Sequence, residues 1–283
     1  MQSWNFCPNL GASIFYAALF ALTTCLHIFQ AFYYRKGYSW VIIMANVWQT
    51  GAYVSRSISI ETPDNIGLYS TWFVLLLCAP LWTNAYVYMV LGRMVWNFKK
   101  GARLHRVKAW HLGKIFVCVD FIALLIQIGG ATIAVTSGNQ STDTTVYLGL
   151  HIYMVGIGIQ LLLIIIFTLF SYSLFRSLRT ELDAEARRLP LLLLYTLWGV
   201  LLLIAIRIIF RLTEYSKGLN STIPNHEAYQ YVLDSTPMLL AAYIFNVIHP
   251  GRIMPGAESD IPGCYTRRQR RKQGIPLERN HSV

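Results

Sequence analysis

The residues best able to do chemistry in this sequence are charged side chains that lie inside apolar stretches. Arg207, Arg211 and Glu214 follow one another at i, i+4 and i+7, so on a helix they project from one face. Asp234 lies one turn into the next apolar stretch, and Arg56 lies near the end of an earlier one. We expect Asp234 to pair with Arg207 or Arg211, because an unpaired charge inside a bilayer costs several kcal/mol. The pattern predicts that these groups meet at one depth and bind the charged head of an amphiphile.

Deeper in the apolar stretches, the polar residues are mostly neutral amides. Gln49, Asn84, Gln127 and Gln160 each fall near the middle of a separate stretch. Asp120 precedes Gln127 by seven residues and therefore shares its helical face. One interpretation is a polar track that guides an amphiphile through an apolar bundle. The other is that the amides only join helices, since each such hydrogen bond contributes about 0.6 kcal/mol in a membrane bundle.

The elements that must position these residues are long and apolar. Hydrophobic residues make up 55% of the 283 residues and charged residues 13%, which is about half the roughly 25% of a typical soluble domain. A helix needs about 20 apolar residues to cross a bilayer. We therefore predict an all-α integral membrane protein, with a seven-helix transmembrane bundle over residues 1–250 and a basic cytoplasmic tail without fixed structure over 251–283. The predicted spans are 10–34, 38–60, 68–96, 112–136, 146–175, 189–212 and 230–248.

The distribution of positive charge predicts which side of the membrane each end of the bundle faces. The net charge is +11, and 18 of the 24 Lys and Arg residues fall on one side, whereas Lys217 alone falls on the other. Because Lys and Arg gather in cytosolic connections, we expect the N-terminus outside and the C-terminus in the cytosol. Two Asn-x-Ser/Thr sequons, at Asn139 and Asn220, fall in connections predicted to lie outside, so both are predicted glycosylation sites. The basic tail should meet anionic lipid first, so we expect no nucleic-acid partner.

Missing motifs exclude several classes of protein. A retinal protein needs a lysine inside the last span, and residues 231–248 contain none. The third and seventh spans lack the motifs of G-protein-coupled receptors and end instead in Leu91-Gly92-Arg93 and Asn246-Val247-Ile248-His249-Pro250. No His-Glu-x-x-His, Gly-x-Ser-x-Gly or phosphate-binding glycine loop occurs, and the histidines lack metal-ligand spacing. We therefore expect no enzyme activity, no cofactor and no metal site.

Six groups of motifs occur in order along nearly the whole chain up to Gly251. They are Gln49-x-x-Ala52-Tyr53-x-x-Arg56, Ala79-Pro80…Tyr86-x-Tyr88-x-x-Leu91-Gly92-Arg93, Asp120…Gln127-x-x-Gly130, Gly149…Gly156-x-x-x-Gln160, Arg207-x-x-x-Arg211-x-x-Glu214 and His226-Glu227-x-x-x-Tyr231-x-x-Asp234…His249-Pro250-Gly251. With these motifs the chain resembles the fungal RTA-like family, named for resistance to aminocholesterol and also called the lipid-translocating exporter family. It departs from the family at Gln49 and Ala52, where relatives usually have Glu and Gly. If that Glu handles substrate or protons in relatives, this protein should differ in ligand or coupling.

The resemblance implies a fungal membrane transporter of amphiphilic lipids, such as sphingoid long-chain bases or sterol-like toxic compounds, that confers resistance to them. Its partners would be membrane lipids and an amphiphilic small-molecule substrate, whose cationic head Asp234, Glu214 or Asp120 would meet. The alternatives are a receptor-like seven-helix lipid sensor that regulates other proteins without transporting, and a scaffold whose polar residues only join helices. We expect the plasma membrane, with another endomembrane as the alternative, because no retrieval motif ends the chain. The residues predicted to bind substrate are Arg56, Asp120, Gln127, Gln160, Arg207, Arg211, Glu214 and Asp234.

Overall fold

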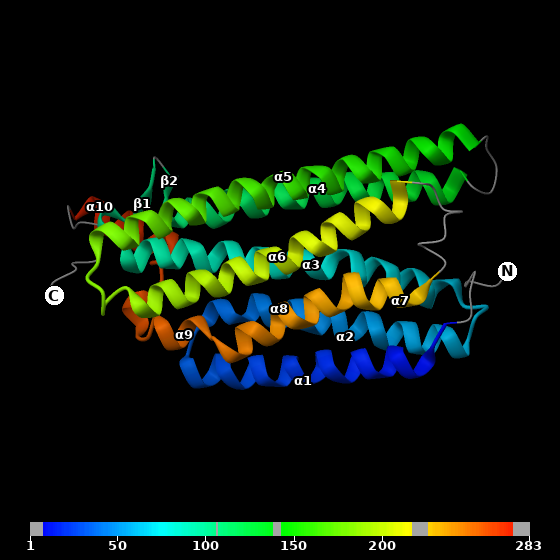
Figure 1. Ribbon diagram of the computed structural model, residues 1–283, viewed down its shortest axis with the longest axis horizontal. Helices are drawn as coiled ribbons and strands as arrows, with labels where there is room; N and C mark the ends of the chain where they lie inside the picture. Colours follow the sequence, from blue (N-terminus) through cyan, green and yellow to red (C-terminus); the bar gives the residue numbers. More distant parts are fainter. Residues whose placement is uncertain (1–7, 106, 138–142, 217–225, 274–283) are drawn as a thin grey trace.

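The computed structural model describes residues 8–105, 107–137, 143–216 and 226–273, and long α-helices account for most of them. The helices lie side by side along one axis, so their ends gather at two opposite ends of the molecule (Figure 1). In chain order they are α1 (Leu10–Tyr34), α2 (Trp40–Glu61), α3 (Ile66–Phe98), α4 (Ala109–Ser137), α5 (Asp143–Glu181) and α6 (Arg188–Ser216). The last segment consists of α7 (Glu227–Gln230), the π-helical turn η3 (Tyr231–Ser235) and α8 (Thr236–Val247), which follow one another directly.

Six helical segments within the described ranges are long and apolar enough to cross a membrane. They are Leu10–Tyr34, Ile66–Phe98, Ala109–Ala134, Thr144–Glu181, Arg188–Glu214 and Glu227–Ile253. The protein is therefore an all-α membrane protein, as predicted, and each of these segments begins within three residues of a predicted span. The second predicted span became α2, which is not among the six. Its inward face carries Asn46, Gln49 and Arg56, and these polar residues lower its mean hydropathy.

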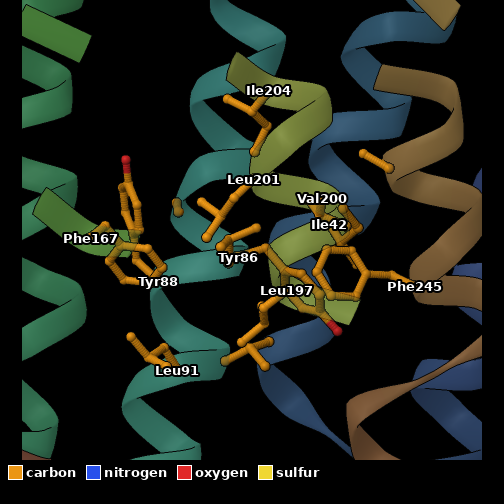
Figure 2. Packing of buried hydrophobic residues seen from close by; sticks show 14 of the residues in the cluster. Ile42, Tyr86, Tyr88, Leu91, Phe167, Leu197, Val200, Leu201, Ile204 and Phe245 are labelled. Atoms are coloured by element: carbon orange, nitrogen blue, oxygen red, sulfur yellow. The ribbon is translucent and has the colours of Figure 1, made fainter. Parts of the chain in front are cut away.

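The hydrophobic core is built around α3, which contacts α2, α4, α5, α6 and α8. Tyr86 and Tyr88 are two residues apart on α3, so they point to nearly opposite sides of the helix (Figure 2). The Tyr86 ring lies 5.0 Å from that of Phe245 on α8, and the Tyr88 ring lies 4.7 Å from that of Phe167 on α5. Through these contacts α3 joins the two halves of the bundle.

Short elements close the end of the bundle where α4 begins and α8 ends (Figure 1). The connection between α3 and α4 contains η2 (Lys100–Ala102) and the strands β1 (Arg103–Leu104) and β2 (Val107–Lys108). The strands pair antiparallel, with Leu104 opposite Val107. The remaining short elements are η1 (Gly37–Ser39), α9 (Pro250–Ile253), η4 (Ala257–Ser259) and α10 (Cys264–Lys272).

The first part of the tail is folded against the bundle, which differs from the prediction of a tail without fixed structure. The buried Lys36 ammonium group donates to the carbonyl oxygen of Gly256 at 2.7 Å and to the hydroxyl of Ser259 at 2.5 Å, and it lies 3.8 Å from the carboxylate of Asp260. The Asn97 amide donates to the Ser259 carbonyl at 2.9 Å. A buried lysine needs several oxygen partners, and residues 256–260 provide them together. Composition alone does not reveal such a match.

Candidate functional site

The predicted pairing between α6 and the last span is present in the structure. Arg207 Nε lies 2.5 Å from Asp234 Oδ1, and Arg211 Nη2 lies 2.6 Å from Asp234 Oδ2. One carboxylate therefore binds two guanidinium groups, whereas the sequence led us to expect one or the other. Asp234 is 1% exposed, and both arginines are buried. The i, i+4 spacing on α6 is what brings the two guanidinium groups to the same acid.

Two further contacts complete this group, which we call the Asp234 cluster: Arg207, Arg211, Glu214 and Asp234. Arg211 Nη1 lies 3.1 Å from Glu214 Oε2, and Arg207 Nη2 donates to the Leu76 carbonyl of α3 at 3.2 Å. Two cations thus face two acids, so the formal charge of the cluster is zero. The cluster fastens α6 to η3 and α3.

Asp234 lies in the π turn η3, which interrupts the α-helical geometry of the predicted span 230–248. The Thr236 amide donates to the Tyr231 carbonyl five residues earlier, and the Thr236 hydroxyl donates to the same oxygen at 2.8 Å. Pro237 follows and has no amide hydrogen, so it cannot continue the ordinary i→i−4 pattern. The adjacent Thr236 and Pro237 are the feature of the sequence that could have indicated this π turn. Single π turns in helices occur often at functional sites.

Arg56 has a partner of its own rather than Asp234. Its Nη2 lies 2.7 Å from Glu227 Oε1 and its Nη1 donates to Gln230 Oε1 at 3.0 Å, so α2 is joined to α7. The guanidinium group also stacks 4.5 Å from the centre of the Trp72 ring on α3. The other Glu227 oxygen accepts a hydrogen bond at 2.7 Å from the backbone N–H of Asn9, which precedes α1. This second group is also neutral overall and ties four segments of the chain together.

Asp120 belongs to a third polar group, which lies among α3, α4 and α5. The Asn84 amide donates to Asp120 Oδ2 at 2.8 Å, and the Gln160 and Tyr88 side chains approach the same carboxyl group. Asp120 is completely buried. We call these four residues the Asp120 group. Unlike Asp234, Asp120 has no Lys or Arg within ion-pair distance among the described residues.

The eight predicted substrate-binding residues are therefore divided among several groups rather than joined in one network of hydrogen bonds and ion pairs. Gln127 lies two turns beyond Asp120 on α4 and packs against Gly156 of α5, where an added Cβ would come within 2.7 Å of Gln127 Cγ. The other seven are divided among the Asp234 cluster, the group that Arg56 forms with Glu227 and Gln230, and the Asp120 group. The predicted glycosylation sites Asn139 and Asn220 lie outside the described residues and stay predictions.

Three stacked tyrosines lie beside Asp234, and none of them was among the residues predicted to bind substrate. Tyr231 of η3 lies 4.9 Å from the Tyr16 ring of α1 and 6.0 Å from the Tyr53 ring of α2, measured between ring centres. The Tyr16 hydroxyl hydrogen-bonds the Thr236 hydroxyl at 2.7 Å, and the Tyr53 hydroxyl hydrogen-bonds that of Ser235. Tyr53 and Tyr231 each occur three residues before a charged residue of the motifs, at Arg56 and Asp234. On a helix that spacing places each tyrosine on the same face as the charged residue, so the sequence could have indicated that they lie together.

The three polar groups lie within the part of the chain that matches a known family. The model of the RTA1-like proteins matches residues 42–257. The chain belongs to the RTA1-like family. The match runs from the first turn of α2 to the beginning of η4, so it includes the residues of all three groups except the Asn9 amide.

Curated relatives within the family are similar over most of the chain. The "Probable lipid transporter atnI" of Emericella nidulans is 37% identical over 90% of this chain and 69% of its own length. The "Sphingoid long-chain base transporter RSB1" of Saccharomyces cerevisiae is 24% identical over 90% of this chain and 75% of its own length. "Protein RTM1" of Saccharomyces cerevisiae is 32% identical over 69% of this chain and 62% of its own length. No solved structure matches the chain.

Proposed function

We propose that this protein moves amphiphilic lipids with a cationic head, such as sphingoid long-chain bases, across the plasma membrane and so confers tolerance of them. The observation that carries the proposal is the match of 90% of the chain to two relatives named as lipid transporters. That match extends over the helical bundle, so it concerns the part of the chain that would hold a lipid. Transport rather than catalysis is the role that these names support.

We propose α2 as the seventh span. Its 22 residues would extend about 33 Å, which is enough to cross the hydrocarbon core. Its exposed apolar residues, Trp40, Val47, Val54 and Ile58, recur at intervals of seven, seven and four and so form an outward stripe. The polar residues of α2 face its neighbours α1 and α3 instead. This distribution suits a helix with lipid on one side and protein on the other.

The end of the bundle that carries most of the Lys and Arg residues would face the cytosol. The connections at this end include Arg35, Lys99, Lys108 and Arg187, and the tail follows at the same end (Figure 1). The positive-inside rule supports this orientation, with α1 beginning outside.

Asp120 is the acid best suited to meet the cationic head of the cargo. Asp234 binds two arginines and Glu214 binds one, so guanidinium groups already balance the charge of both carboxylates. The Asp120 group supplies one carboxylate, two amides and one phenol, all neutral except the acid. An ammonium group donates up to three hydrogen bonds, which these oxygens can accept. The Asp234 cluster would then hold the helices in place around the route.

Replacement of Asp120 by Asn tests this role. We expect export of a labelled sphingoid base from cells to fall about tenfold or more, because the amide loses a charge-assisted hydrogen bond to the ammonium group. Asp64→Asn is the matched control, since it makes the same chemical change at an exposed position between α2 and α3. Surface levels of both variants are measured in parallel. Export by Asp120→Asn at the wild-type rate and surface level would remove Asp120 from the route.

A further inference from the structure

A cavity of about 510 Å³ lies at the basic end of the bundle, away from the three polar groups described above. It is lined by the later turns of α3, the first turns of α4, the tail segment 261–263 and Arg267 of α10. Three of its lining residues are glycines, Gly92, Gly113 and Gly263. A Cβ at Gly92 would lie 3.0 Å from the Ala109 carbonyl oxygen and one at Gly113 would lie 3.4 Å from the Tyr88 carbonyl oxygen, so these two glycines let α3 and α4 approach closely beside the cavity. The cavity is thus bounded by α3, α4 and the folded tail together.

The polar lining of this cavity is entirely cationic. Arg93, Lys114 and Arg267 line it, and its described lining includes no acid. Arg93 lies 3.8 Å from Asp260 just outside the cavity, and Arg267 stacks 5.0 Å from the centre of the Trp110 ring. Lys114 is exposed and has no acidic partner within the described part of the chain. Three cations converging on one space favour an anionic ligand.

An apolar path leaves the cavity along α4. Lys114, Cys118, Ile122 and Leu125 are spaced i, i+4, i+8 and i+11, so they share one face of the helix, and all four are exposed. The cation is at the membrane surface end of this face, and the three apolar residues follow toward the middle of the bundle. A phospholipid has the same order of chemistry, with a charged head at the surface and an acyl chain pointing inward.

We propose that this cavity binds the headgroup of an anionic phospholipid, with one acyl chain lying along Cys118, Ile122 and Leu125. Trp110 lies one turn before Lys114 on α4, at the surface end of the same face, and tryptophan is common at membrane interfaces. Arg267 brings the tail into the site, so bound lipid would also hold α10 against α4. The assignment to the cytosolic leaflet rests on the proposed orientation, whereas the binding itself is independent of transport.

The test is lipid binding to the purified full-length protein in detergent micelles, with bound lipid counted by native mass spectrometry. Phosphatidylserine and phosphatidylcholine with identical acyl chains are titrated separately, and inorganic phosphate is titrated as a third probe. We expect phosphatidylserine to bind more tightly than either. The double variant Lys114→Ala/Arg267→Ala should bind phosphatidylserine roughly tenfold more weakly, because two cations near the headgroup are lost.

A matched double variant separates this site from a general effect of charge. Arg252→Ala/Arg268→Ala removes the same two charges from exposed positions that do not line the cavity, and it should leave affinity nearly unchanged. Val117→Trp keeps every charge but fills the lining, so it too should weaken binding. Equal weakening in both double variants, undiminished binding after loss of Lys114 and Arg267, or equal affinity for phosphatidylcholine would overturn the proposal. Binding of inorganic phosphate as tight as that of the lipid would overturn the lipid assignment as well.

Discussion

Replacing Asp234 by Asn should lower the free energy of unfolding by about 3–5 kcal/mol. The substitution nearly preserves the shape of the side chain but removes the carboxylate that both Arg207 and Arg211 contact, and Glu214 is the buried acid of the cluster that remains. Both arginines lie within 2.6 Å of the Asp234 carboxylate, and all four residues are buried, so solvent cannot replace the lost charge. Unfolding of the purified protein in detergent micelles measures the loss, with Asp64→Asn as the exposed control.

Restoring the charge balance should recover much of that loss. Arg207→Met in the Asp234→Asn background leaves Arg211 paired with Glu214, so one cation again faces one acid. We therefore expect the double variant to be more stable than Asp234→Asn alone, even though it carries an additional substitution. If the loss of stability came only from packing around Asp234, the second substitution would add a second defect. The double variant would then be less stable than Asp234→Asn. A double variant less stable than the single one would refute the charge-balance explanation.

Gly130→Ala should destabilise the protein by about 3 kcal/mol through the contact between α4 and α5. A Cβ at Gly130 would lie 2.4 Å from the backbone nitrogen of Tyr153 and 2.7 Å from the Gly149 carbonyl oxygen. Neither neighbour is a flexible side chain, so the two helices would have to separate. Small residues of this kind let helix backbones approach closely inside membranes.

The adjacent glycine provides the control for this prediction. A Cβ at Gly129 would meet nothing within 4 Å, so Gly129→Ala should be neutral or stabilising by up to about 1 kcal/mol, since alanine favours the helix. Gly149→Ala should behave like Gly130→Ala, because its Cβ would lie 2.5 Å from the backbone nitrogen of Ala134. The three variants are compared by unfolding in the same micelles. Similar stabilities for Gly129→Ala and Gly130→Ala would contradict the close contact.

The sequence predicted the helices well because their signal is local. A long run of apolar residues is sufficient to place a span, and α1 begins and ends where the first run does. For α2 the same signal is weaker, because the buried Gln49 and Arg56 lower the mean hydropathy of the helix. Its exposed face is nevertheless apolar. Its place beside α1 and α3 appears only when the contacts are seen.

The grouping of the polar residues could be predicted only in part. The pairing of α6 with Asp234 followed from charge and spacing, because few acids lie at that depth. The partner of Arg56 did not follow, since Glu227 precedes the span and its side chain reaches Arg56 only from the first turn of α7. The separation of Asp120 from the arginines also depends on which helices are neighbours. α4 contacts α3 and α5 most extensively, and this arrangement gives Asp120 amide and phenol neighbours rather than cations.

The most direct test of the account reconstitutes the purified protein in liposomes and times the movement of a fluorescent sphingoid base between leaflets. We predict faster movement than in protein-free liposomes, in proportion to the protein added, with Asp120→Asn slow and Asp64→Asn equal to wild type. Saturable binding of the base with movement no faster than in protein-free liposomes would contradict transport and indicate a lipid sensor instead.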